Sequence, residues 1–587
     1  MLRKPEPSTP SKSRHRTHHA PAPASTIDAL LVFAVIFAAL WLSHLPLLRL
    51  PYFWDEAGYF IPAARDILLT GDLIPHTTLS NAHPPLVMLY LALCWKLTTY
   101  SVLVTRTAVL LVAASGFTAL WLLARRISSP AVATATVLLT AVSPTVFSQS
   151  TMAQLDIAAF ALLLWTLYSH IAGRRWQAIL FAALAAVAKE TTVAVTITLM
   201  GTDLLGLIAY RWRPALAAKW CLPRRTFLQS AAYLLALVPL VAWYAYHFHR
   251  TGHVFGNPDY LRYNVGATLT PLRILLAGLM RLWHAAGYMN LFVLTASALL
   301  LLWSALPEKT SGAPPSPQLH AAKVGISEPH QSMPRSSTPV PEALVPAAPP
   351  IAANVQLLLA LVVLAQVAEF SVVGGALLAR YMIAAVPLVI LLSVNIVRMY
   401  APRWQWWIAG CAAAFLAALF FNPPWFISPE DNLTWTDYVR MHQQAARYVE
   451  QHYAQDRILT AWTASDELNR PFLAYVEKPL SIVRIENFTA EEILRAASQT
   501  ENFDVVVAFS TKYEPPRGLF QRIPGWTRIQ TRYFDYHQDL PARAISKLLH
   551  GRIVWQANSP GEWIAIIEID KIRNAGSSDP GRLTAND

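Results

Sequence analysis

Two adjacent carboxylates, Asp55 and Glu56, follow the first long apolar segment of the chain and stand directly after Phe53 and Trp54. A carboxylate beside aromatic side chains at a membrane surface is costly to desolvate, so such residues usually have a functional task. One such task is to take the proton from an attacking hydroxyl group. The alternative is a solvated loop or a helix cap, because Asp is a common N-cap residue. The pair by itself leaves both interpretations open.

More charged residues stand at the ends of other apolar segments: Arg106, Asp156, Lys189 with Glu190, Glu369, and Arg380 with Tyr381. Each one alone is compatible with a structural ion pair or an interfacial side chain, but charged residues at membrane depth tend to mark a substrate path. Guanidinium groups also suit phosphate oxygens, because they bind in a bidentate fork. The functional interpretation therefore depends on whether the fold brings these residues to one side.

The composition is that of an integral membrane protein. Hydrophobic residues make up 54% of the 587 residues and charged residues only 14%, against about 25% in soluble domains. A net charge of +12 would suggest nucleic-acid binding in a soluble chain, but here the positive residues form short clusters between apolar segments, such as Arg125-Arg126 and Arg174-Arg175. Such clusters are typical of cytoplasmic loops, so nucleic-acid binding is disfavoured.

A spanning helix needs about 20 apolar residues, and this length criterion predicts an all-α membrane bundle. We expect eleven crossings: Ala29–Leu48, Thr107–Ala124, Ala131–Phe147, Ile157–Ala172, Trp176–Ala188, Val193–Tyr210, Phe227–Tyr246, Ala285–Leu306, Ile351–Val372, Met382–Val397 and Trp406–Phe421. We expect an amphipathic helix at Pro271–Trp283, in an outer loop. Together the crossings form a transmembrane domain over residues 27–421.

One further apolar segment, Leu86–Trp95, is short and would invert every later loop if it crossed the membrane. As an interfacial helix within a first outer loop at residues 49–106, it leaves all the arginine clusters on the cytoplasmic side. The charge distribution favours this second topology. It predicts a cytoplasmic N-terminus and places Asp55, Lys189 and Arg380 on the outer face.

The segments outside the crossings differ in character. Residues 1–26 and 571–587 are expected to be disordered, and residues 307–350, rich in Pro, Ser and Ala, to form a flexible cytoplasmic linker. Residues 432–570 alternate polar helical patterns with short β-rich stretches, which predicts a soluble α/β domain on the periplasmic side. Its expected helix is Asp437–His452, and its expected strands are Arg457–Trp462, Phe503–Phe509, Gly551–Trp555 and Trp563–Ile569.

Neither the cysteines nor the potential metal ligands form a compact motif. The widely spaced Cys94, Cys221 and Cys411 are expected to be buried thiols. Carboxylate and imidazole groups could hold a divalent metal, but their spacing does not demand one. No cofactor is therefore assigned, and a divalent metal stays possible at Asp55, Glu56, His83 and Asp156.

Taken in order, these motifs resemble the protein O-mannosyltransferase and aminoarabinose-transferase superfamily, membrane glycosyltransferases of the GT-C fold. The matching pieces are Asp55-Glu56, Ala82-His83-Pro84-Pro85-Leu86, Arg106, Gln149 to Asp156, Ala188-Lys189-Glu190, and Arg380-Tyr381 with Pro387 beyond. Two positions depart from the pattern. Relatives commonly have Lys-Gly at Lys189-Glu190, and the aminoarabinose branch usually has Lys at His83 where the mannosyl branch has His. The histidine favours a neutral sugar.

The resemblance implies an inverting glycosyltransferase of the inner membrane. It would move a sugar from a polyprenyl-phosphate to a lipid, glycan or protein acceptor on the periplasmic face, in glycosylation of the cell envelope. A lipid phosphate leaves without a general acid, so the site needs a base for the acceptor and cations for the phosphate. The expected catalytic residues are Asp55 as base, Glu56 to orient the loop or acceptor, and Asp156. The expected phosphate ligands are Arg106, Lys189, Arg380, Tyr381 and His83.

Two other functions stay open. A transporter or lipid flippase would also carry charges in its spans, but the chain shows no repeat between its halves and no Walker-type glycine loop. A non-catalytic sensor or assembly factor would use the outer domain to bind a partner. Sugar transfer from radiolabelled polyprenyl-phosphate donors separates these functions, with Asp55→Asn as the test variant and Glu430→Gln as its control.

Overall fold

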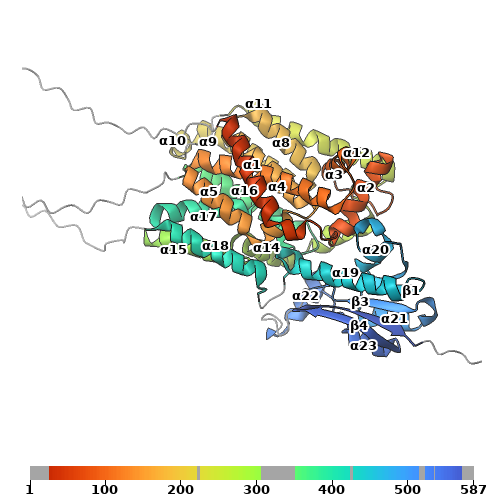
Figure 1. Ribbon diagram of the computed structural model, residues 1–587. Helices are drawn as coiled ribbons and strands as arrows, with labels where there is room; N and C mark the ends of the chain where they lie inside the picture. Colours follow the sequence, from red (N-terminus) through yellow and green to blue (C-terminus); the bar gives the residue numbers. More distant parts are fainter. Residues whose placement is uncertain are drawn as a thin grey trace, which may run out of the picture.

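The computed structural model describes residues 25–220, 222, 225–305, 351–423, 427–513, 522–534 and 536–570. Within them a mostly helical bundle is followed by a five-stranded sheet with flanking helices, which lies at one end of the bundle in Figure 1. Residues 1–24, Cys221, the predicted linker and the predicted C-terminal tail lie outside the described residues. Ser25 caps the first helix, which begins at Thr26, so the predicted disordered N-terminus extends two residues too far.

The bundle consists of apolar helices joined by short connections. They are α1 (Thr26–Ser43), α2 (Ile61–Thr70), α3 (Leu86–Leu97), α4 (Val102–Ile127), α5 (Pro130–Val142), α6 (Pro144–Gln149), α7 (Leu155–Ile171), α8 (Arg175–Ala188), α9 (Val193–Trp212), α10 (Pro214–Lys219), α11 (Phe227–Ala231), α12 (Val238–Thr251), α13 (Pro258–Asn264), α14 (Pro271–Ala286), α15 (Leu291–Ser304), α16 (Ala353–Val372), α17 (Val386–Tyr400) and α18 (Trp404–Phe420).

Helix length and composition make the chain an integral membrane protein. Five described helical spans are long and apolar enough to cross a bilayer: 26–43, 102–127, 190–212, 227–251 and 353–372. The pair α14 and α15 could form a sixth, bent span, and six shorter apolar helices, α3 among them, accompany these. The count of eleven crossings and the interfacial position of α3 stay predictions.

One predicted crossing begins later than expected and another is interrupted. The predicted amphipathic helix Pro271–Trp283 corresponds to α14, and the predicted crossing Ala285–Leu306 corresponds to α15, which begins only at Leu291 after an 82° bend. Met289 and Asn290 have positive φ angles at this break, a conformation that ends a regular helix. The segment Ala131–Phe147 is divided into α5 and α6 at Ser143, since Pro144 lacks the N–H group that a continuous helix would need.

The helix order places the arginine clusters and the candidate site at opposite ends of the bundle. Arg106 lies in the first turns of α4 and Arg125-Arg126 in its last turn, which separates them by about 30 Å along the helix. Lys189 follows the last turn of α8, whereas Arg174 precedes its first turn. At the helix ends opposite the arginine clusters, Asp55, Asp156, Lys189 and Arg380 are joined by ion pairs.

The C-terminal part begins with a short 3₁₀ turn, η7 (Pro429–Asp431), and the long helix α19 (Thr434–His452). Its sheet has the order β2-β1-β3-β5-β4, in which β2, β1 and β3 are parallel and β5 is antiparallel to both β3 and β4. The remaining elements are β1 (Arg457–Ala461), α20 (Ala464–Asn469), β2 (Ser481–Ile485), α21 (Ala490–Ala497), β3 (Val505–Phe509), α22 (Trp526–Phe534), α23 (Ala542–Leu548), β4 (Gly551–Ser559) and β5 (Glu562–Ile569).

The sheet agrees with four expected strands and adds a fifth. Sequence patterning missed β2, because this edge strand is short and carries Ser481 and Arg484 on exposed positions. The central strand β3 is buried at all five positions, as expected for a strand covered on both faces. The amphipathic α19 packs against β4 and β5.

The C-terminal domain is fixed to the bundle through the segment around Asp55. The Trp54 ring lies 5.0 Å from the Trp462 ring, and the hydroxyl group of Tyr475 donates to the Tyr52 carbonyl at 3.0 Å. Gly58 is required here, since a Cβ atom at this position would lie 2.7 Å from the Trp462 indole. The acidic loop is therefore held between the bundle and the sheet domain.

Candidate functional site

Five connecting segments converge on one polar cluster, and each contributes a residue from a helix end. Asp55 precedes the π-helical turn η2 (Glu56–Phe60), Asp156 lies in the first turn of α7, and Lys189 follows α8. Arg380 lies in the 3₁₀ turn η6 (Ala379–Met382) between α16 and α17, and Glu430 in η7 after α18. Helix ends leave backbone groups and side chains at the rim of a bundle, which is where such a site can form.

Arg380 is the centre of this cluster. Its side chain is 5% exposed and forms short ion pairs and hydrogen bonds with Asp55 and with the Gln154 side chain. The carboxylate of Glu430 accepts from Arg380 Nη1 at 2.9 Å, and Asp156 Oδ2 lies 3.7 Å from Nε. One guanidinium group is thus surrounded by three carboxylates.

Lys189 is the second cation of the cluster. Its Nζ atom donates to Asp156 Oδ1 at 2.5 Å, so that Asp156 contacts both cations. The ammonium group also lies 4.7 Å from the centre of the Tyr381 ring and 5.3 Å from that of Phe370. These aromatic faces stabilise the charge by cation–π attraction where water is largely excluded.

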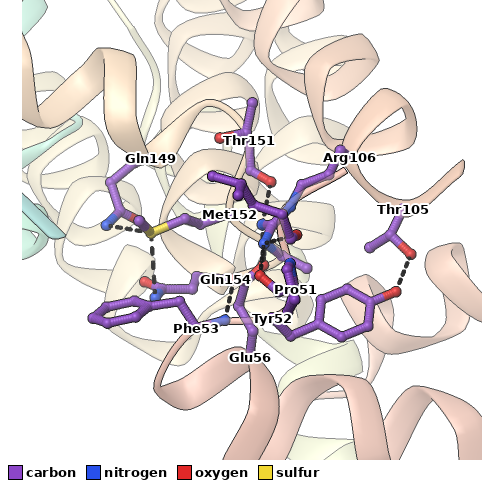
Figure 2. Close-up of polar contacts among 12 residues, drawn as sticks. Pro51, Tyr52, Phe53, Glu56, Thr105, Arg106, Gln149, Thr151, Met152 and Gln154 are labelled. Carbon is purple, nitrogen blue, oxygen red and sulfur yellow. Dashed lines mark hydrogen bonds and ion pairs between the residues drawn. The ribbon is translucent and has the colours of Figure 1, made fainter. Parts of the chain in front are cut away.

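Glu56 and Arg106 form a separate ion pair that is completely buried. Figure 2 shows Glu56 pointing at the Arg106 guanidinium group; Oε1 and Nη1 are 2.5 Å apart and neither side chain has exposed surface. The Phe53 and Ala153 amides also donate to Glu56, at 2.9 and 2.5 Å. Arg106 in turn donates to the carbonyl oxygens of Thr151, Pro51 and Leu50.

The pair of Glu56 and Arg106 joins three segments of chain, residues 50–56, the start of α4 and residues 151–153, and has no surface exposed to a ligand. Arg106 uses Nη1 and Nη2 on protein oxygens, and its Nε is buried without a partner among the described residues. The structure therefore favours a positioning role for Arg106 over the phosphate-binding role expected from the sequence. The contact of Glu56 with the Phe53 amide agrees with the expectation that Glu56 orients the loop.

His83 contacts a residue other than the central cluster. Its Nδ1 lies 3.1 Å from Glu190 Oε2, and the two side chains are 14% and 25% exposed. Glu190 directly follows Lys189, so the pair borders the cluster on the side of α8. Glu190, which stands where relatives commonly have Gly, thus pairs with His83.

Two residues of the cluster were not assigned a role from the sequence. Glu430 was chosen there as a control away from the site, whereas its carboxylate contacts Arg380. Gln154 bonds both Arg380 and Glu430. The only sequence signal for Glu430 was a pair of carboxylates, Glu430 and Asp431, directly after the last apolar segment, the same arrangement as at Asp55.

Burial changes the ionisation of the two carboxylates in η7. Burial raises the pKa of Glu430 to about 8, although the Arg380 guanidinium acts in the opposite direction. Burial also raises the pKa of Asp431 to about 6, against the hydrogen bond from the Tyr288 hydroxyl group.

No group of three or more His, Cys, Asp or Glu side chains within the described ranges is arranged to hold a metal ion. The carboxylates of the cluster face Arg380 and Lys189 instead. Cys94 and Cys411 are free thiols.

Comparisons with known proteins give similarity at the level of the fold. No family model matches the chain, and no curated protein matches it. Among solved structures it is similar to ArnT from Cupriavidus metallidurans, in a crystal structure bound to undecaprenyl phosphate and in another of the apo state. Each has 12% sequence identity and a TM-score of 0.48, and covers 92% of this chain and 98% of that one.

Proposed function

We propose that the protein is an inverting glycosyltransferase that moves a sugar from a polyprenyl-phosphate donor to an acceptor on the periplasmic face of the inner membrane. The observation that carries the proposal is the joining of Asp55, Lys189 and Arg380 in one cluster at the end of the bundle opposite the arginine clusters. This supplies a base and two cations within one site, as the reaction requires. We assign a polyprenyl-phosphate donor because the sequence motifs resemble those of a superfamily whose members use such donors.

Asp55 is the base of the proposed reaction. Its side chain is 32% exposed, whereas Asp156 and Glu430 on the same arginine are 7% and 2% exposed. Only the exposed carboxylate can approach an acceptor hydroxyl group without displacing protein contacts. The acceptor oxygen bonds to the anomeric carbon, its proton passes to Asp55, and the bond from that carbon to the phosphate oxygen breaks.

Arg380 and Lys189 stabilise the leaving lipid phosphate. As Asp55 takes up the proton it loses its charge, and its ion pair with Arg380 weakens. The guanidinium group then becomes available while negative charge grows on the phosphate, which is the moment at which stabilisation lowers the barrier. Asp156 holds Lys189 in place, and the Tyr381 ring keeps the ammonium group away from water.

The remaining expected site residues take supporting roles in this proposal. Glu56 and Arg106 position the loop that carries Asp55. His83, paired with Glu190, borders the donor site and contributes contacts to the sugar or its phosphate. The sheet domain lies beside the same loop and so faces the acceptor. The positive-inside rule places the arginine clusters in the cytoplasm and this end in the periplasm.

The test is transfer of radiolabelled sugars from polyprenyl-phosphate donors, with full-length protein in membranes. Asp55→Asn is expected to lower the rate by about 10²- to 10⁴-fold, the usual contribution of a general base. The matched control is Asp437→Asn, a half-exposed carboxylate on α19 that contacts Arg440 and Ser559 rather than the cluster. It should retain the full rate.

Other outcomes would favour the other functions. Well-folded protein that transfers no sugar from any donor, yet moves the donor lipid across the bilayer, would show a flippase. A protein with neither activity would fit a sensor or assembly factor. Equal rates for Asp55→Asn and Asp437→Asn would contradict the assignment of the base.

A further inference from the structure

Glu430 belongs to the last connection between the bundle and the sheet domain. Pro429 starts the short turn η7, and Ser428 and Asp431 close it by reciprocal side-chain to backbone hydrogen bonds. Glu430 and Asp431 of this turn are buried, and Glu430 contacts a residue fifty positions earlier, Arg380. A residue introduced by the link to the C-terminal domain thus completes the cluster in the bundle.

The two oxygens of Glu430 have different surroundings. Oε2 accepts from Arg380 Nη1 at 2.9 Å and from Gln154 Nε2 at 3.3 Å. Oε1 is buried and has no hydrogen-bond partner among the described residues. A buried, half-satisfied carboxylate is unfavourable as an anion, since half of its charge lies on an unsolvated oxygen. The neutral acid avoids this cost.

The charge count of the cluster points in the same direction. Arg380 and Lys189 supply two positive charges, and the three carboxylates in contact with them, Asp55, Asp156 and Glu430, would supply three negative ones. One proton balances the cluster. Of the three acids, Glu430 is the most buried, and Asp431 adds further negative charge beside it. Tyr288 donates to Asp431 at 2.6 Å, and the charge of Arg281 also acts on Asp431. Glu190, which pairs with His83, and Glu369 lie near Lys189.

We infer that Glu430 holds this proton, so that the cluster is electrically neutral rather than anionic and can admit the lipid phosphate beside Arg380. The inference rests on the proposed function and deepens it, because it names the residue that sets the strength of the phosphate site. Glu430 acts through Arg380 and is a positioning residue. When Glu430 ionises, the three carboxylates exceed the two cations by one negative charge, and the cluster repels an anion. Burial places this change near pH 8.

The test compares binding of undecaprenyl phosphate and sugar transfer at pH 7 and pH 9, in full-length protein. One pH unit above a pKa the protonated fraction falls by about tenfold, so wild-type affinity and rate should both fall by about tenfold. Glu430→Gln keeps an uncharged side chain that can accept from Arg380, and should lose less than twofold over the same range. Glu430→Asp keeps an acid and should retain a pH dependence. Asp437→Asn should show the same fall as the wild type, and any change that remains in Glu430→Gln measures the titration of the ligand itself.

The outcomes separate this inference from the proposed function. If Glu430→Gln shows the same loss as the wild type between pH 7 and pH 9, the inference is overturned even where transfer is observed. If no transfer occurs but binding shows the expected difference between wild type and Glu430→Gln, the phosphate site stands and the glycosyltransferase proposal fails. Absence of binding by the wild type at pH 7 overturns both. A thermal unfolding curve for each variant identifies any that does not fold.

Discussion

Asp55 and Glu56 are neighbours in the sequence and belong to two ion pairs of opposite character. Glu56 pairs with Arg106 where neither side chain has any exposed surface, and both carboxylate oxygens are satisfied by protein donors. Asp55 pairs with Arg380, is one-third exposed, and shares that arginine with two other carboxylates. The fully hydrogen-bonded, buried pair of Glu56 and Arg106 fixes the loop. The partly exposed pair of Asp55 and Arg380 can exchange a proton and a ligand.

The difference arises from the direction of the two side chains. The backbone turns into the π-helical η2 at Glu56, and neighbouring residues on a helix point to different sides. Glu56 therefore faces the junction of α4 and the segment before α7, while Asp55 faces η6.

Removal of the buried carboxylate should have the largest effect. Glu56→Gln leaves Arg106 charged, buried and without its anion, which costs about 3 to 5 kcal/mol of stability in comparable cases. We expect a large fall in the unfolding temperature in detergent and in the yield of membrane-inserted protein. Replacing both partners, as in Glu56→Leu with Arg106→Met, should be less destabilising than Glu56→Gln alone. If Glu56→Gln is as stable as the wild type, the proposed positioning role of the Glu56–Arg106 pair is contradicted.

Removal of the second cation should act on the reaction more than on the fold. Lys189→Gln is expected to lower kcat/KM by about 10²- to 10³-fold, the effect of removing one group that stabilises a developing anion. Arg125→Gln is a matched control, because this cation lies at the other end of α4. Equal rates in both variants would place the phosphate elsewhere.

The contact between the acidic loop and the sheet domain should have an intermediate effect. In Gly58→Ala the new methyl group would approach the Trp462 indole to 2.7 Å, and overpacking of this kind costs about 1 to 3 kcal/mol. Gly201→Ala, where a Cβ atom meets nothing within 4 Å, is the control. Measured unfolding temperatures should differ between the two, and unchanged stability in Gly58→Ala would show that the loop adapts.

The smallest effect on stability is expected at Asp55 itself. Because its ion pair is partly exposed, Asp55→Asn should change the unfolding free energy by about 1 kcal/mol or less, although it removes transfer activity. Thermal unfolding of Asp55→Asn beside Glu56→Gln gives the direct comparison. A loss of stability at Asp55 as large as that at Glu56 would mean that both acids are structural.

Sequence patterns predicted the local elements well where one periodicity dominated. The apolar α4, α9 and α16 and the amphipathic α19 lie near their predicted ranges, because a long stretch with one pattern has one favourable fold. The separation of α14 from α15 was also predicted, although α15 begins six residues later than expected. The edge strand β2 was missed, because it buries little surface.

The sequence predicted most residues of the site but not which of them contact one another. The residues Asp55, Asp156, Lys189, Arg380 and Tyr381 were singled out and do lie together. Both Arg106 and Arg380 stand beside apolar segments in the sequence. In the structure Arg106 is completely buried in its pair with Glu56, whereas Arg380 contacts several carboxylates. Glu430 was taken for a control, since its distance in sequence from Arg380 conceals their contact.

The sequence by itself determined that the chain enters a membrane, which segments are apolar, and which charges stand at their ends, because these properties depend on composition and order along the chain. Which charge meets which was decided only by the tertiary structure. Partners such as Asp55 and Arg380 are 325 positions apart, and the ionisation of a carboxylate depends on burial and on neighbours that the packing of the helices brings together.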